Sequence, residues 1–370
     1  MMSQPGATSS RTSTLCTVGT ALPPHRYEQA ELSEMFLELI GDTGLNPEVV
    51  RRVHGNAGVS TRHLALPAEQ YLALRTFGEA NDAFIDAAVD LGSRALLDAL
   101  AQAGLAPKDV DLVASATVTG IAVPSLDARI AAQVGLRQDV RRVPLVGLGC
   151  VAGAAGIARV HDYLLGHPEH VAVLVAIELC SLTVQRDDPS MANVVASGLF
   201  GDGAAAVVLT GARHPGAEGR SAEVVVRDSR SRMYAGTERA MGWDVGHTGL
   251  RIVLGAEVPR LVETHLRDDV DGFLAEHGLT RDDIGWWVAH PGGPKVLEAM
   301  QAALEVPRAA LGLTWTSLDR IGNLSSASVL HVLADTLRER PPAPGTHGML
   351  LAMGPGFCLE MVLLHSGDPR

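Results

Sequence analysis

Short apolar runs alternate with longer stretches of helical periodicity along almost the whole chain. Two of the longest runs, VAVLVAI at 171–177 and AAAVVLT at 204–210, have the length and composition of buried strands. Patterns such as VAGAAGIARVHDYLL at 151–165 lie between the runs, and their alanines and apolar spacing predict buried helices. The alternation predicts an α/β fold in which helices cover a mostly buried sheet.

The pattern also repeats. Three segments of the first half share their order of helix, turn and strand with three segments of the second half. The pairs are 97–121 with 273–293, 147–160 with 320–333, and 200–210 with 354–364. Cys150 lies 46 positions after Gly104, and Asn323 lies 45 positions after Gly278. Chance similarity of generic strand–turn–helix units is the alternative, but the kept order favours two halves related by a pseudo-twofold axis, which brings the two corners together.

Length and charge refine this organisation. The chain has 370 residues, more than one core usually holds, and its hydrophobic residues, 46% of the total, include few aromatics. We expect a flexible N-terminal tail over residues 1–14, a first half over residues 15–223 and a second half over residues 224–370. The net charge of -12 argues against broad binding of nucleic acid or of an anionic membrane.

Targeting signals and metal motifs are not recognised in the sequence. The apolar runs are shorter than the ~20 residues that cross a bilayer, and the first residues lack the apolar core of a secretory signal, so we expect a cytoplasmic protein. The four cysteines have neither Cys-x-x-Cys nor Cys/His ligand spacing, which argues against a disulfide scaffold and against a zinc site. They are Cys16, Cys150, Cys180 and Cys358. No metal and no organic cofactor is expected.

Cys150 occupies the corner between an apolar run and the helix expected over residues 151–165. Gly149 precedes it, and the small residues that follow let a substrate approach closely. A helix N-terminus favours thiolate over thiol through its dipole and free N–H groups. A buried structural cysteine is the alternative interpretation, but the Gly-Cys corner favours a nucleophile.

Two further residues complete a candidate constellation. His290 follows an expected strand and precedes Pro-Gly-Gly, where a side chain projects from the sheet edge. Asn323 stands at the corner equivalent to Cys150 and can donate two N–H bonds to an oxyanion or enolate, although a helix cap is the commoner role of asparagine. A Cys–His–Asn set indicates acyl transfer through a thioester. The residues alone leave open whether water, as in a hydrolase, or a decarboxylated malonyl unit, as in a condensing enzyme, takes the acyl group.

Six motifs resemble those of one enzyme family. They are GLGCVAGAAG at 147–156, ELCSLTVQ at 178–185, LFGDGAAA at 199–206, AHPGGPKV at 289–296, GNLSSAS at 322–328 and MGPGF at 353–357. On these motifs the chain, from about Leu15 to its end, resembles the bacterial type III polyketide synthases of the thiolase fold, relatives of chalcone synthase. The resemblance implies an αβαβα layered fold, a homodimer with the region near Val123 at its interface, and acyl-CoA and malonyl-CoA as substrates.

The resemblance also implies roles for single residues. Cys150 would accept the acyl group, His290 and Asn323 would stabilise the enolate formed by decarboxylation, and Phe200 would be a gatekeeping ring over the cavity. Without the family, Phe200 is a core aromatic before a Gly-Asp-Gly turn. The other cavity positions implied are Thr183, Cys180, Ile252, Val123, Ser325 and, as the loop that shapes the cavity floor, Gly354, Pro355 and Gly356.

Substrate choice and CoA binding follow less directly from the resemblance. Ile252 stands where plant relatives carry a second gatekeeper phenylalanine, which suggests a roomier tunnel, and motifs such as ELCSLTVQ look like those of alkylpyrone and alkylresorcinol synthases, which take fatty acyl starters. Basic residues for the CoA phosphates would be Arg51, Arg52, Arg62 and Lys295, of which Arg52 aligns best. Lys295 reads equally well as a solvated lysine at a helix start, and Asn56 replaces one expected basic residue.

Three functional hypotheses follow. The first is an iterative synthase that makes an alkylpyrone or alkylresorcinol. The second is a single-step condensing enzyme like ketoacyl-ACP synthase III, which shares the Cys–His–Asn set but generally lacks the proline seen here as Pro355. The third is a catalytically silent partner subunit, against which the intact Cys150, His290 and Asn323 argue.

Overall fold

Nine strands pair in the order β11-β12-β13-β8-β1-β7-β6-β4-β5 in the computed structural model, which describes residues 12–215 and 224–367. These strands are β1 (Ser13–Ala21), β4 (Leu112–Thr117), β5 (Arg141–Val146), β6 (Val171–Leu179), β7 (Asp202–Gly211), β8 (Val224–Met233), β11 (Ile284–Ala289), β12 (His347–Gly354) and β13 (Cys358–Ser366). Two separate hairpins pair β2 (His25–Glu28) with β3 (Thr61–Leu64), and β9 (Met241–Gly246) with β10 (Gly249–Leu254).

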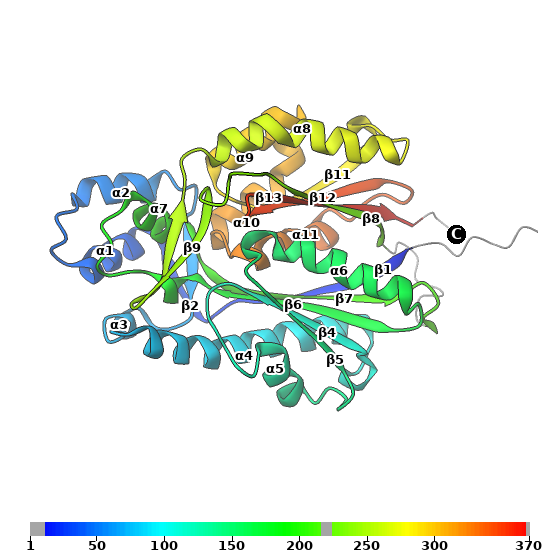
Figure 1. Ribbon diagram of the computed structural model, residues 1–370, viewed down its shortest axis with the longest axis horizontal. Coiled ribbons are helices and arrows are strands. Elements are labelled where there is room, and N and C mark those ends of the chain that lie inside the picture. The colour runs from blue at the N-terminus through cyan, green and yellow to red at the C-terminus, as the bar shows by residue number, and fades with distance from the viewer. Residues whose placement is uncertain (1–11, 216–223, 368–370) are drawn as a thin grey trace, which may run out of the picture.

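The helices divide this sheet into layers. They are α1 (Gln29–Ile40), α2 (Pro47–Gly55), α3 (Ala68–Tyr71), α4 (Phe77–Ala103), α5 (Leu126–Val134), α6 (Ala152–Gly166), α7 (Met191–Leu199), α8 (Val258–Glu276), α9 (Pro294–Leu304), α10 (Gly312–Ile321) and α11 (Ser328–Glu339). Figure 1 shows α4 and α5 outside the first half of the sheet, α6 and α11 between the halves, and α8 and α9 outside the second half. This is the expected αβαβα arrangement.

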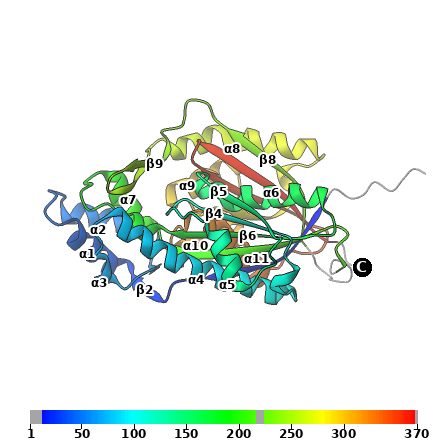
Figure 2. The ribbon, with the colours of Figure 1, turned by 60° about the horizontal axis from the view of Figure 1, so that its bottom comes forward.

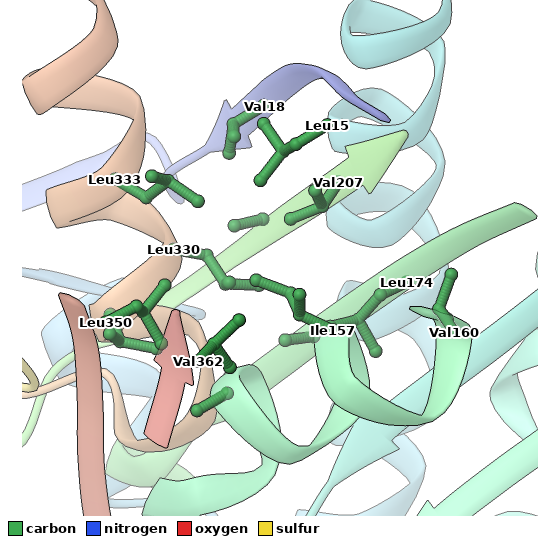
Figure 3. Close-up of a cluster of buried hydrophobic side chains, with 14 of the residues drawn as sticks. Leu15, Val18, Ile157, Val160, Leu174, Val207, Leu330, Leu333, Leu350 and Val362 are labelled. Atoms are coloured by element: carbon green, nitrogen blue, oxygen red, sulfur yellow. The ribbon is translucent and has the colours of Figure 1, made fainter. Parts of the chain in front are cut away.

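The central layer carries the largest apolar cluster. Ile157 of α6 and Leu330 of α11 are fully buried between Leu174 of β6 and Val362 of β13 (Figure 3). A Cβ on Gly153 would lie 2.4 Å from the backbone oxygen of Ser326, so the two central helices approach as closely as a glycine allows. The tight contact fixes the N-terminal ends of α6 and α11 next to each other.

The internal repeat predicted from the sequence corresponds to equivalent elements. The end of α4 and β4 match the end of α8 and β11, α6 matches α11, and β7 matches β13. β13 and β7 lie inside the sheet, whereas β11 forms one edge and β4 is next to the other edge, and the equivalent helices share the middle layer. The corners that precede α6 and α11 therefore lie together, as the spacing predicts.

The first strand begins two residues earlier than the expected tail allows. Ser13 and Thr14 pair with Gly211 and Thr210 and are buried, and the Ser13 hydroxyl lies 2.8 Å from Nδ1 of His161. A partner distant in sequence satisfies this polar strand end, so the local pattern could not identify it as buried. The rest of the tail, residues 1–11, lies outside the described residues.

Elements at one end of the sheet build a cap over the corners. Helices α1, α2 and α7 pack on one another, and α7 also contacts β10. Figures 1 and 2 both show this cap at the end opposite the chain terminus. Among the described residues, no helix is apolar over a length that would cross a bilayer.

Acid should destabilise the fold through its buried histidines, of which His331 on α11 is the cleanest test. Burial lowers the pKa of His331 from 6.5 to about 4. Between pH 6.5 and pH 4 the imidazole is therefore protonated in the unfolded chain and neutral in the folded chain. Stability is therefore present above pH 6.5 and is lost as the pH falls. We expect His331→Gln to reduce the loss of unfolding free energy between pH 7 and pH 5 by about 2 kcal/mol, measured by urea denaturation. An unchanged pH dependence would show that His331 is protonated in the folded state.

Candidate active site

The Cys150 corner is a short 3-10 turn, η2 (Gly149–Val151), between β5 and α6. Gly149 has φ 56°, and a Cβ there would lie 2.7 Å from Cδ of Pro355, so both the backbone angle and the close contact require glycine. A Cβ on Gly354 would come within 3.3 Å of the Cys150 backbone nitrogen, which places the Gly354–Gly356 loop directly against the corner. The thiol thus lies between two loops whose close approach requires small residues at Gly149 and Gly354.

The second corner, from the other half of the chain, faces the first. Its 3-10 turn, η7 (Ser325–Ala327), precedes α11, and Ser325 has a positive φ of 47° although it is not glycine. The Cys150 thiol donates toward Ser325 Oγ at 3.6 Å. Backbone bonds of 2.9 Å from Gly201 N to Asn323 O and from Asn323 N to Leu199 O join the corner to the end of α7.

The two corners and the end of β11 enclose a small space, here called the catalytic cavity, which Cys150, His290 and Asn323 line together with Phe200. His290 follows β11, and its backbone nitrogen donates to Leu351 O at 2.9 Å. The remaining wall is almost wholly apolar, with Met300, Met353 and other aliphatic and aromatic side chains. The three predicted residues therefore converge from both halves of the chain on one space with largely apolar walls.

The thiol is held in its neutral form by its surroundings. Burial raises the pKa of the Cys150 thiol to about 12, the bond with Ser325 opposes this rise, and the charge of Glu178 adds to it. The helix end favours the thiolate, but burial outweighs it in the free protein. The proton must therefore leave for a nearby base when an acyl donor is bound.

His290 and Asn323 can each donate a hydrogen bond without carrying a charge. Burial lowers the pKa of His290 to about 3, so the imidazole is neutral at pH 7 and offers one N–H donor and one acceptor nitrogen. Its Nδ1 is buried and has no hydrogen-bond partner among the described residues. The Asn323 Oδ1 accepts from Ser325 N at 2.8 Å and from Ser328 Oγ at 3.4 Å, which leaves the amide nitrogen to donate to a ligand.

A larger space, here called the main cavity, adjoins the catalytic cavity at Cys150 and Phe200, which line both. Met241 and Leu254 also line both cavities, so Phe200 is one of several side chains at their boundary. Six of the cavity positions implied by the resemblance do line the main cavity: Phe200, Thr183, Cys180, Ile252, Ser325 and Pro355. Leu32, Met35, Phe36 and Leu39 of α1 form an apolar wall on another side.

The comparisons with known proteins cover both halves. The family model of chalcone and stilbene synthases, N-terminal domain, matches residues 3–213, and the model of their C-terminal domain matches residues 226–367. The chain is a type III polyketide synthase of the chalcone and stilbene synthase family. Such enzymes are acyltransferases, so the synthase is an acyltransferase as well.

Relatives and solved structures agree with this assignment. The synthase is 54% identical to the 1,3,6,8-tetrahydroxynaphthalene synthase of Streptomyces peucetius subsp. caesius over 96% of its own length and 93% of the relative. It is 31% identical to an alpha-pyrone synthesis polyketide synthase-like protein of Mycobacterium tuberculosis over 94% of its own length and 89% of that protein. The crystal structure of tetrahydroxynaphthalene synthase from Streptomyces coelicolor superposes with a TM-score of 0.88 at 31% identity, covering 96% of this chain and 99% of that one.

Three of the implied cavity positions do not line the main cavity of the synthase. Val123 is 90% exposed on the surface, because the Val123-Pro124 segment turns outward ahead of α5. Gly354 and Gly356 pack against the Cys150 backbone and against Cys358, so they support the floor from behind while Pro355 forms it. A sequence motif marks the whole loop and does not show which of its residues faces inward.

The implied CoA-binding residues also differ from one another. Arg62 is only 3% exposed, and its guanidinium donates to Gln29 Oε1 and to the backbone oxygens of Ser197 and Phe200. Assigning it to CoA phosphates was wrong, since this cation supports the cavity wall from inside. Arg51 is exposed but forms a two-pronged ion pair with Glu34, at 2.6 and 2.8 Å.

Arg52 and Lys295 remain available for a phosphate group. Both are exposed, and neither side chain forms an ion pair or hydrogen bond among the described residues. Lys295 starts α9, five positions after His290, and Gly292 between them lines the catalytic cavity. This placement is compatible with a cation at the cavity mouth.

Sequence reasoning missed two residues of the site. Trp243 lines the main cavity and pairs with Ile252 across the β9–β10 hairpin. The indole therefore lies next to the space that opens where isoleucine replaces the phenylalanine of plant relatives. The volume of the Trp243 indole counteracts the widening of the tunnel that we expected from Ile252. Glu178 is fully buried behind Cys150 and accepts from Thr119 Oγ1 at 2.9 Å and from Ser326. The motif ELCSLTVQ contained Glu178, but its contacts join segments distant in sequence.

Proposed function

We propose that the synthase loads an acyl group from an acyl-CoA onto Cys150 and extends it by repeated decarboxylative condensation with malonyl-CoA. The observation that carries the proposal is the convergence of Cys150, His290 and Asn323 on one apolar cavity. Loading breaks the thioester of CoA and forms a thioester of Cys150, with the thiol proton passing to the acceptor nitrogen of His290. CoA leaves as the thiol by taking this proton back.

Extension uses the same donors a second time. When malonyl-CoA loses CO₂, negative charge develops on the thioester oxygen of the remaining enolate. The neutral His290 and the Asn323 amide nitrogen donate to this oxygen in a site with apolar walls, where such bonds are stronger than in water. The enolate carbon then attacks the acyl carbon on Cys150 and displaces its sulfur.

We propose a compact polyketide built from malonyl units as the product. The relative of 54% identity makes tetrahydroxynaphthalene, whose ten carbons all belong to its rings and correspond to five two-carbon units without an alkyl tail. Trp243 in the main cavity supports a product of this kind, because the indole takes space that a long acyl chain would need. Incubation with malonyl-CoA alone, followed by mass spectrometry, is expected to yield a five-unit aromatic product.

A fatty acyl starter that leads to an alkylpyrone or alkylresorcinol is the second candidate. The apolar wall of Leu32, Met35, Phe36 and Leu39 favours it, since this surface suits a hydrocarbon chain. The same experiment with a panel of acyl-CoA starters and labelled malonyl-CoA decides between the two products. A single extension in every reaction would instead favour a condensing enzyme of the ketoacyl-ACP synthase III type.

We also propose a homodimer whose interface includes Val123. Ile121 is 50% exposed and Val146 is 72% exposed, so apolar side chains gather near Val123 and along the edge strand β5. A second copy on this surface would cover them and the open edge. Analytical ultracentrifugation of the wild type and of Val123→Asp tests the proposal, and a wild-type monomer would contradict it.

Removing the Trp243 indole should change starter selection. Trp243→Ala opens space beside Ile252, and we expect the ratio of kcat/KM for octanoyl-CoA to that for self-primed malonyl-CoA to rise about tenfold, a size of effect typical of pocket volume changes. Val245→Ala, on the same strand but 72% exposed, is the matched control and should leave the ratio unchanged. An equal ratio in both variants would mean that Trp243 does not limit the starter.

A further inference from the structure

A third space, here called the side chamber, opens beside the main cavity. The two share Leu39, Tyr71, Thr119, Ser181, Thr183 and Val184 as walls. The side chamber has a volume of about 330 Å³, against about 90 Å³ for the main cavity, so it has room for a ligand group much larger than one water. Neither Cys150 nor the other two catalytic residues line it.

Two arginines give the side chamber its charge. Arg75 and Arg186 both line it, and Asp187 is its one lining carboxylate among the described residues, which leaves a net charge of +1 in a chain of net charge -12. Asp187 forms an ion pair with Arg251 at 3.3 Å. Neither Arg75 nor Arg186 forms an ion pair with any carboxylate among the described residues.

The Arg186 guanidinium is held by a backbone oxygen and not by a carboxylate. Arg186 donates to the backbone oxygen of Tyr71, which ties it to the wall shared with the main cavity. Glu79, the nearest carboxylate in sequence to Arg75, caps α4 by accepting from Arg75 N at 2.7 Å and Thr76 N at 2.9 Å. Burial lowers the pKa of Arg186, and the like charge of Arg75 lowers it further. Glu79 lies close enough to Arg75 to interact with its charge, but its carboxylate accepts from the backbone N–H groups of the α4 cap. Two neighbouring cations with no ion pair of their own are suited to bind an anion.

Unsatisfied polar atoms lie on the same walls. Gln185 is only 5% exposed, its Nε2 donates to Thr183 O and Leu250 O, and its buried Oε1 has no partner among the described residues. Thr248 Oγ1 is also buried and unpartnered there. A buried acceptor without a donor is costly, so a ligand hydroxyl or enol that reaches Gln185 would be favoured.

We propose that the side chamber binds the carboxylate at the starter end of the growing chain, with Arg75 and Arg186 as its ligands. This inference rests on the proposed malonyl-primed function. A malonyl starter keeps a free carboxylate, and each extension inserts two carbons at Cys150 and moves that carboxylate farther from the sulfur. The carboxylate carbon is the one atom in excess of the five two-carbon units, so it leaves as CO₂ before the ten-carbon product is complete. The arginines hold it away from His290 and Asn323, and the enolised carbonyls of the chain supply the donor for Gln185.

Direct binding tests the chamber without catalysis. The probe is 3,5-dihydroxybenzoate, and its neutral counterpart is 3,5-dihydroxybenzamide, both titrated into the full-length protein in a calorimeter. We expect the acid to bind about tenfold more tightly than the amide, and Arg75→Gln to remove this preference. Arg94→Gln, which alters an exposed arginine paired with Asp90 on α4, is the matched control. Equal affinity for acid and amide, or no binding of the acid, would overturn the proposal.

Product analysis then tests what occupies the chamber. Arg75→Gln and Arg186→Gln should reduce the yield from malonyl-CoA alone about tenfold relative to Arg94→Gln. Because Arg186 also supports Tyr71, thermal unfolding of both variants is compared with the wild type, and the Arg75 variant decides if the other is unstable. An unchanged yield with a lost acid preference would refute the starter carboxylate as the occupant. Failure of the wild type to make any polyketide would refute the proposed function while the binding result still stands.

Discussion

Cys150→Ala is expected to reduce polyketide formation by at least about 10³-fold while malonyl-CoA still loses CO₂. The sulfur is the only thiol or hydroxyl group lining the catalytic cavity among the described residues, so without it no stable thioester or ester can hold the acyl chain there. The donors for the enolate are other residues. Released CO₂ is measured with carboxyl-labelled malonyl-CoA, and products are measured by mass spectrometry.

The matched control for this variant is Cys16→Ala. Cys16 lies on β1, far from the cavity walls, and shares only the thiol chemistry. It should leave both readouts at the wild-type level. Polyketide formation by Cys150→Ala at more than a tenth of the wild-type rate would show that the acyl group is not carried by this cysteine.

The three candidate catalytic residues could be selected from the sequence because local patterns mark the corners of two of them and the repeat marks the third. The Gly-Cys pair and the strand before Pro-Gly-Gly are each visible in a short window of sequence. Asn323 alone resembles a helix cap, and only the repeat marks its corner as the equivalent of Cys150 and predicts that the two corners meet. The bond between Cys150 and Ser325 across the two corners agrees with that prediction. The alternation of strands and helices predicted an α/β fold, and the order of the layers came from the family resemblance.

The cavity walls could not be predicted in this way because they come from elements outside the repeat. Trp243 belongs to the β9–β10 hairpin, and the apolar wall belongs to α1, so their place depends on packing between distant segments. The burial of Arg62 could not be predicted for the same reason, since an exposed arginine and a buried arginine have the same letter in the sequence. The partners that permit its burial, Gln29 and two backbone oxygens, are distant or carry no sequence signal.

Asn323→Ala is expected to lower the release of CO₂ from malonyl-CoA by about 10²- to 10³-fold, the cost of removing one donor from an oxyanion site. The transfer of an acyl group from acyl-CoA to Cys150 should change much less, because the sulfur and His290 remain. Labelled enzyme is quantified by intact-protein mass spectrometry after a short incubation with the acyl-CoA.

The opposite responses of the two variants separate the two half-reactions. Cys150→Ala keeps decarboxylation and loses loading, whereas Asn323→Ala keeps loading and loses decarboxylation. Because the Asn323 Oδ1 also accepts from Ser325 N, the alanine variant could loosen the corner that faces the thiol. Ser328→Ala removes the 3.4 Å bond to the same oxygen and the 2.6 Å bond that Ser328 Oγ accepts from Leu324 N, and it keeps the amide donors, so it reports the effect of loosening the corner. If Ser328→Ala and Asn323→Ala impaired decarboxylation equally, the amide would position the corner, and His290 would be the donor to the enolate.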